Sequence, residues 1–294
     1  MGVRIGLVQP LAHRPPADER NVAQAVELVG SAAAAGAQLV VLPETYPGPW
    51  RMPAAYDPTP QVAEAAGRLG VYVLFGTLEP LEARGPGAAP PANDRRAHNL
   101  LVLAGPDGTV RAVYRRTHPP GPWLYVGGDA WDFDYVAAED VVVADTEHGR
   151  LGLGMCSEVY VPEVSRALAL RGTEIILLPA GVDKGRLWAT WRNLVWARAI
   201  ENLAVTVTTQ NLFSDEERGL AMVAGPEDVL FETARPGVFV VDVDLTRVRA
   251  LRAEHDDAAS SQRNAAKAGV LTQWRRPELY PSWLGSGEPA QTAR

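Results

Sequence analysis

The sequence predicts an α/β fold, and two observations support this prediction. Strand-like apolar runs alternate with helix-like segments along most of the 294 residues. In addition, GAQLVVLPE at 36–44 resembles GTEIILLPA at 172–180, and each segment follows a predicted helix, opens with glycine and stops at proline. The echo predicts two similar halves whose strand ends line one site, because ligands of α/β folds gather at the carboxyl ends of strands. The copies differ in their last residue, Glu44 in the first and Ala180 in the second.

The first part of the chain predicts three strands and two helices. Residues 3–9 form an apolar run typical of a buried strand. The helix predicted at 18–35 has valines at helical spacing, and Gly36 suits the position just past its end. Further strands are predicted at 38–42 and 71–76, with a helix between them at 60–69. The proline- and glycine-rich stretch 84–96 is expected to be a surface loop, since strands resume directly after it.

The rest of the chain continues the alternation. The turn Gly-Pro-Asp-Gly at 105–108 predicts a hairpin between strands at 98–104 and 109–114. Further strands are predicted at 141–145, 150–155, 203–209, 221–224 and 238–243, and helices at 162–170, 186–202 and 246–253. The chain after about residue 256 is expected to be extended or irregular, with a frayed end at 285–294. We therefore expect one domain at 1–280 and a C-terminal tail at 281–294.

Composition and charge restrict the class of protein. A single cysteine cannot form an internal disulfide, which favours a reducing compartment, and we expect a soluble, cytoplasmic protein. The N-terminus lacks a signal-peptide profile, and no run of about 18 apolar residues occurs. A net charge of −7 argues against binding to nucleic acid or to an anionic membrane. The histidines form no metal-binding pattern, and no dinucleotide or P-loop fingerprint is complete.

Cys156 lies where the strand at 150–155 should end, shortly before a helix. Nucleophiles of hydrolases use such a strand-to-helix turn, because it exposes the side chain and directs backbone N–H groups toward it. A free cysteine is also a common buried filler, and position alone favours that alternative. Glu44 likewise has a structural and a functional interpretation. It either caps the next turn or is the base that a thiol requires.

Five motifs in order then resemble the nitrilase, or carbon–nitrogen hydrolase, superfamily. They are NVAQAVELVGSAAAAGAQLVVLPE, YRRTH, GRLGLGMCSEVYVPEVSRALALRGTEIILLPA, WARAIEN and RRPELY. The resemblance extends from Val3 to Tyr280. It implies a four-layer α-β-β-α sandwich that forms dimers or larger oligomers. It also implies a Glu–Lys–Cys triad acting on amides or nitriles, without a metal or an organic cofactor.

Carried over residue by residue, the resemblance assigns the general base to Glu44 and the nucleophile to Cys156. The family's Tyr-Arg-Lys-x-His stretch matches 114–118, so Arg116 occupies the lysine position. The family's frequent second glutamate is absent from 119–129. Arginine keeps the positive charge and the hydrogen bonds, but it stays protonated. It is therefore expected to stabilise charge in the site rather than to shuttle a proton.

Substrate contacts are predicted for three further residues. Glu158 lies two residues after the thiol. It either contacts the substrate or is a solvated carboxylate of the turn, and the sequence leaves both interpretations open. Trp123 and Tyr125 belong to the aromatic and acidic stretch 121–135, which is expected to line a substrate pocket or an oligomer interface. The tryptophans of the helix at 186–202 are interpreted as core or interface residues, namely Trp188, Trp191 and Trp196.

The leading hypothesis is a thiol hydrolase of C–N bonds. An amide substrate is favoured over a nitrile, because Ser157 follows the cysteine where nitrilases often carry an aromatic residue. A catalytically altered or ligand-binding member is the alternative from another class, and an enzyme that transfers the acyl group to an amine is a third. A papain-like pairing of Cys156 with His118 or His148 is a remote fourth.

Overall fold

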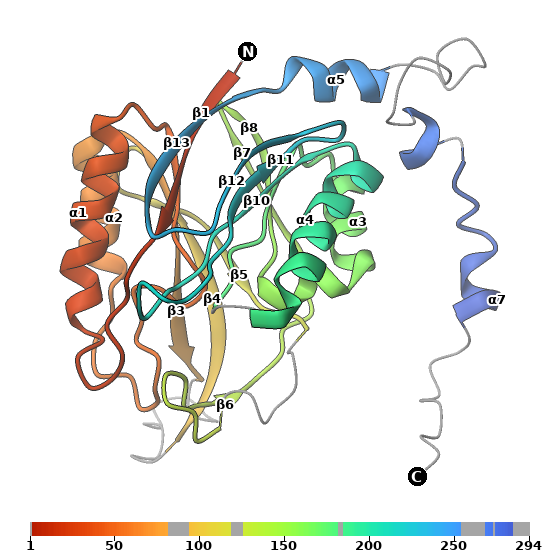
Figure 1. Ribbon diagram of the computed structural model, residues 1–294. Helices are drawn as coiled ribbons and strands as arrows, with labels where there is room; N and C mark the ends of the chain where they lie inside the picture. The colour runs from red at the N-terminus through yellow and green to blue at the C-terminus, as the bar shows by residue number, and fades with distance from the viewer. Residues whose placement is uncertain are drawn as a thin grey trace.

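Two β-sheets packed face to face form the centre of the molecule, in a computed structural model that describes residues 2–81, 94–118, 126–181, 185–253, 268–272 and 274–284. Helices α1 (Arg20–Ala34) and α2 (Thr59–Leu69) cover the outer face of one sheet. Helices α3 (Pro162–Leu170) and α4 (Trp188–Asn202) cover the other (Figure 1). The layers are therefore α-β-β-α, and the predicted fold class is confirmed.

The two sheets have mixed strand directions. The first sheet contains, in spatial order, β13 (Gly237–Asp244), β1 (Gly2–Gln9), β2 (Leu39–Val41), β3 (Tyr72–Pro80), β4 (Arg96–Ala104) and β5 (Val110–Arg115), with β6 (Asp134–Tyr135) paired to β4. The second contains β12 (Val229–Thr233), β11 (Ala221–Ala224), β10 (Val205–Thr208), β9 (Ile175–Leu177), β8 (Gly149–Leu153) and β7 (Val142–Thr146). In both sheets the central strands are parallel and the outer pairs antiparallel.

Both faces of the central strands are buried, which explains their continuous apolar runs. On β1, Ile5 and Leu7 belong to the core that also holds residues of the second sheet, such as Leu153 and Val207. On the same strand, Val8 packs in a separate cluster with residues of α1. Because strand side chains alternate between faces, one apolar strand contributes to two layers of core.

The echoed segments occupy equivalent positions in the two sheets. β2 lies between β1 and β3, and β9 lies between β8 and β10, each in parallel pairing. The ends of the two segments meet, since the Glu44 N–H donates to the Ala180 carbonyl at 3.2 Å. The repeat in the sequence therefore brings two strand ends to one place.

Some predictions were wrong or incomplete. β6 and β12 were not predicted, because β6 has two residues and β12 alternates partly buried with exposed positions. Part of the chain after residue 256 is helical rather than irregular, at η4 (Ala268–Leu271) and α7 (Tyr280–Leu284). Most of the predicted loop at 84–96 and the tail at 285–294 lie outside the described residues. No helix of the described part of the chain is long and apolar enough to cross a membrane.

Candidate active site

The residues predicted to be catalytic follow the ends of three strands. Glu44 comes shortly after β2, Arg116 directly after β5, and Cys156 shortly after β8, as the first residue of the turn η2 (Cys156–Tyr160). The Cys156 N–H donates to the Pro179 carbonyl at 2.8 Å, and the Glu44 N–H donates to the next carbonyl, that of Ala180. The segment after β9 thus holds the backbones of the glutamate and the cysteine next to each other.

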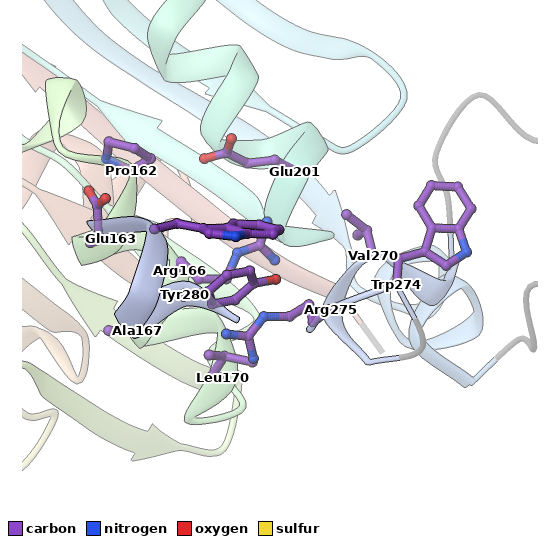
Figure 2. A pocket seen from close by; sticks show the side chains of 11 residues that line it. Pro162, Glu163, Arg166, Ala167, Leu170, Glu201, Val270, Trp274, Arg275 and Tyr280 are labelled. Atoms are coloured by element: carbon purple, nitrogen blue, oxygen red, sulfur yellow. The ribbon is translucent and has the colours of Figure 1, made fainter. Parts of the chain in front are cut away.

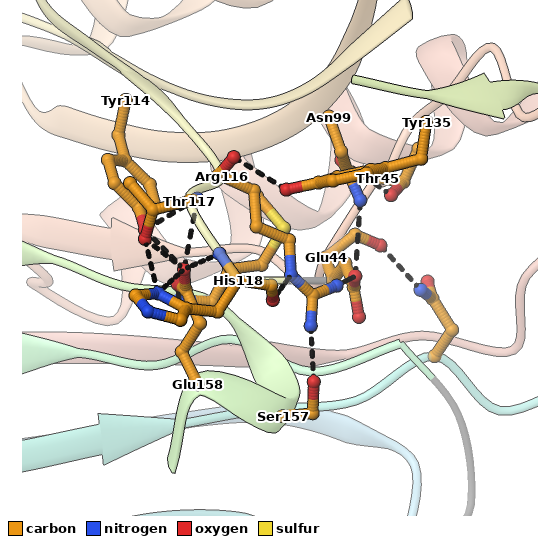
Figure 3. A network of polar contacts seen from close by, with 12 residues as sticks. Glu44, Thr45, Asn99, Tyr114, Arg116, Thr117, His118, Tyr135, Ser157 and Glu158 are labelled. Carbon is orange, nitrogen blue, oxygen red and sulfur yellow. Dashed lines mark hydrogen bonds and ion pairs between the residues drawn. The ribbon is translucent and has the colours of Figure 1, made fainter. Parts of the chain in front are cut away.

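Arg116 links the glutamate to the turn that carries the thiol. Its Nη1 donates to Glu44 Oε1 at 2.7 Å, and the two side chains are 0% and 4% exposed. Its Nη2 donates to Ser157 Oγ at 2.5 Å, and Figure 3 shows the guanidinium between these two partners. Taking a charged pair out of water is costly unless the pair is close and well hydrogen-bonded, and this pair satisfies both conditions.

Two asparagines that the sequence did not indicate also hold Glu44. The Asn99 side chain donates to Glu44 Oε1 at 3.1 Å, and Asn99 in turn accepts from Thr45 Oγ1 at 3.0 Å. The Asn211 side chain donates to the Glu44 carbonyl at 2.9 Å. An Asn inside the apolar run of β4 is a signal that could have identified Asn99, because buried amides need partners. Figure 3 shows Asn99 between Glu44 and Thr45.

Cys156 has an unusual backbone conformation. Its φ is +48°, in the left-handed region that a residue with a side chain rarely adopts, and the residue is 8% exposed. Such strain is concentrated at functional sites, and a sharp turn after a strand is where hydrolases hold a nucleophile. This geometry favours the nucleophile over the buried filler.

Glu158 binds protein groups on all sides. Its Oε1 accepts from the Tyr114 hydroxyl at 2.6 Å, the Thr117 hydroxyl at 2.8 Å and the His118 N–H at 3.0 Å. Its Oε2 accepts from the Met155 N–H at 2.7 Å. The carboxylate is fully buried, so it is not the solvated turn residue of one interpretation. Its contacts tie the chain around Arg116 to the turn around the thiol, and they favour positioning over substrate contact.

The surroundings of Glu158 shift three pKa values. Burial raises the pKa of Glu158, but hydrogen bonds from His118 and Tyr114 and the charge of Arg116 outweigh it, so the pKa is lowered overall. The pKa of Tyr114 is raised, first by burial and then by the Glu158 charge. The nearby Glu158 carboxylate raises the pKa of His118. The network therefore holds Glu158 as a carboxylate.

Replacing Glu158 by glutamine is expected to destabilise the protein in a pH-dependent way. The lowered pKa stabilises the fold above the ordinary value of 4.5, and this stabilisation is lost as the pH falls through the folded value. At pH 7, Glu158→Gln should lower the free energy of unfolding by about 2–3 kcal/mol, because an amide cannot accept as many hydrogen bonds. Urea unfolding at pH 7 and near pH 4 measures the difference, with the exposed Glu163→Gln as control. An equal loss at both pH values would contradict this role.

The two histidines considered as partners of the thiol have other contacts. His148 precedes β8 whereas Cys156 follows it, so the papain-like pairing with His148 is wrong. His118 Nδ1 contacts the Thr117 hydroxyl at 2.8 Å and lies 3.8 Å from Glu158 Oε1. Trp123 and Tyr125 lie outside the described residues, and their predicted contact with substrate stays a prediction.

Two further features of the described residues bear on ligands. They contain no group of three or more His, Cys, Asp or Glu side chains that could hold a metal ion.

A cavity of about 560 Å³ lies on the outer side of α3 (Figure 2). It is lined by α3, by Glu201 of α4 and by C-terminal residues such as Trp274, Tyr280 and Trp283. None of Glu44, Arg116 and Cys156 lines this cavity.

Comparison with known proteins gives the same family as the motifs. The profile of the family described as carbon-nitrogen hydrolase matches residues 4–253. The omega-amidase NIT2 of Xenopus tropicalis is 24% identical over 271 residues, which are 85% of this chain and 91% of that protein. The deaminated glutathione amidase of Synechocystis sp. (strain PCC 6803 / GT-S) is 27% identical over 259 residues, 82% of this chain and 92% of that protein.

Solved structures share the fold. An amidase from Nesterenkonia sp. AN1, whose active-site cysteine carries the acetamide moiety of fluoroacetamide, superposes with a TM-score of 0.69 at 23% identity, covering 90% of this chain and 96% of that one. A carbon-nitrogen hydrolase from Helicobacter pylori G27 superposes with a TM-score of 0.70 at 20% identity, covering 85% of this chain and 92% of that one. The fold and the site thus define an α-β-β-α protein whose single cysteine follows a strand end. The chain belongs to the carbon–nitrogen hydrolase family.

Proposed function

We propose that this protein hydrolyses the C–N bond of small amides through a thioester on Cys156, with Glu44 as general base and Arg116 in place of a catalytic lysine. The observation that carries the proposal is the buried Arg116–Glu44 pair, whose guanidinium also binds the residue next to the thiol. The relatives named as amidases support an amide substrate. A neighbouring structure, the amidase from Nesterenkonia sp. AN1 with bound butyramide, supports a small one.

The reaction divides into two steps. Glu44 takes the proton of the Cys156 thiol, and the sulfur bonds to the carbonyl carbon of the amide. The C–N bond then breaks, Glu44 gives the proton to the leaving nitrogen, and a thioester and ammonia or an amine result. In the second step Glu44 takes a proton from water, whose oxygen attacks the thioester. The C–S bond breaks, the acid leaves and the thiol regains its proton.

Arg116 supplies positive charge in both steps. Its guanidinium stays protonated, so it can stabilise the thiolate and the negative oxygen of the tetrahedral intermediate. The hydrogen bond from Nη2 to Ser157 Oγ directs the charge toward the thiol turn. The Glu44 carboxylate compensates this charge while the site is empty.

Labelling of the thiol and loss of the base test the proposal. Incubation with fluoroacetamide should add one acetamide moiety to the intact protein, as the thiol sulfur displaces fluoride, and Cys156→Ala should prevent the addition. Glu44→Gln keeps the shape of the side chain but removes the base, so amide turnover should fall by at least about 10²-fold. Equal turnover by wild type and Glu44→Gln would reduce Glu44 to a structural role. Absence of labelling and of turnover with acetamide, butyramide and similar amides would overturn the proposed activity.

We also propose that the protein forms a homo-oligomer, at least a dimer. Trp274 and Trp283 are 52% and 68% exposed beside the cavity on α3, and exposed apolar groups of this size are typical of contact surfaces. Arg166 supports a contact there as well, because its buried Nη1 has no hydrogen-bond partner in the described part of the chain. Light scattering at micromolar concentration should give at least twice the 31.6 kDa chain mass, and a monomer mass would contradict the proposal.

A further inference from the structure

Trp131 lies at the edge of the candidate active site. A methyl group in place of a Gly181 hydrogen would be 2.7 Å from Glu44 Oε2 and 3.3–3.4 Å from Trp131 Cη2 and Cζ2. The same point in space therefore borders both the catalytic carboxylate and the edge of the indole ring. Gly181 follows Ala180, whose carbonyl binds the Glu44 N–H. Glycine at 181 lets the Glu44 carboxylate and the Trp131 ring approach this closely, because a Cβ there would clash with Glu44 Oε2.

The indole atoms nearest Gly181, Cη2 and Cζ2, belong to the six-membered ring. Cζ2 is bonded to the carbon that holds Nε1, so the N–H lies along the same side of the ring. Nε1 is buried and has no hydrogen-bond partner within the described residues. A buried donor without an acceptor is unfavourable and rare in native structures. A bound molecule that brings an acceptor to this edge would remove that cost.

Trp131 is also part of a rigid aromatic wall. It stacks on Trp50 with a ring separation of 5.4 Å, and it meets Phe213 edge to face at 6.4 Å. Its neighbour Asp132 exchanges backbone hydrogen bonds with Trp50 and Met52 at 2.9 and 3.0 Å. Preorganised groups of this kind determine specificity, because little ordering accompanies binding.

We propose that Trp131 is a specificity-determining residue that contacts the acyl side of the substrate. The Trp131 ring, supported by the buried Trp50 and by Phe213, selects an uncharged, largely apolar acyl chain. The Trp131 N–H selects a hydrogen-bond acceptor within that chain, such as an ether oxygen. The substrate class is thus a small neutral amide with one acceptor in its acyl chain. This inference rests on the proposed amide hydrolysis at the same site.

A pair of nearly isosteric amides tests the inference. Pentanamide and 3-methoxypropanamide differ by one methylene that is exchanged for oxygen. Their binding is measured with the full-length Cys156→Ala chain, so that the result does not require turnover, and kcat/KM is measured with the wild-type thiol. The ether amide should bind about 3–10-fold more tightly, the range that one neutral hydrogen bond provides. Trp131→Phe keeps an aromatic ring without the N–H and should abolish or reverse this preference, whereas Trp131→Ala should weaken the binding of both amides.

Trp196→Phe is the matched control, because the Trp196 indole N–H on α4 is also buried without a partner. It should leave the preference unchanged. If Trp131→Phe keeps the wild-type preference, or if the Cys156→Ala chain binds neither amide, the inference is overturned. Binding with the expected preference but without turnover by wild type would contradict the proposed hydrolysis and support the subsite.

Discussion

Cys156→Ala is expected to reduce amide turnover by roughly 10⁴-fold or more, because no thioester can form without the sulfur. The fold should persist, since alanine fills most of the same space and the backbone contact of residue 156 with Pro179 does not involve the side chain. Alanine is as strained as cysteine at this φ of +48°, so the substitution should neither add nor relieve backbone strain. Product formation and thermal unfolding measure the two effects.

Ser165→Ala is a suitable control for this variant. Ser165 is fully buried on α3, and its hydroxyl has no partner among the described residues. Losing this small polar group should leave turnover near the wild-type value. A Cys156→Ala protein with wild-type rates on a verified substrate would refute the thiol mechanism.

Arg116→Ala is the variant with the second largest expected effect. It leaves the Glu44 carboxylate buried without its cation, which is expected to cost about 3–5 kcal/mol of stability or to drive a proton onto Glu44. Either outcome removes the base or its position, so turnover should fall by at least about 10²-fold. Arg115→Ala is the matched control. Arg115 is the neighbouring strand residue, and its partly exposed pair with Glu79 contributes at most about 1 kcal/mol.

Arg116→Lys distinguishes two views of this residue. If Arg116 works as the family lysine does, the lysine variant should keep partial activity or exceed wild type, since a compact ammonium carries the same charge. If the guanidinium fills and blocks the site, wild type should be inert toward every amide tested, and Arg116→Lys alone should restore activity. Comparable turnover by wild type and Arg116→Ala would contradict both views.

The sequence by itself determined most of the fold. Apolar spacing and the residues after each element predicted α1, α3 and α5 (Thr246–Ala253) to within a few residues. The echo of 36–44 in 172–180 predicted two facing halves, and their ends do meet between Glu44 and Ala180. Periodicity records which face of each element is buried, so these predictions needed only local information.

Only the tertiary structure decided which side chains surround Glu44, Arg116 and Cys156. Asn99 and Asn211 reach Glu44 across 55 and 167 residues of sequence, and Tyr114 reaches Glu158 across 44. Such partners depend on strand order and on the packing of one sheet against the other, which local periodicity does not encode. For the same reason the sequence left Glu158 between substrate contact and solvent, whereas the structure surrounds it with five backbone and side-chain donors from β5, residues 117–118 and Met155.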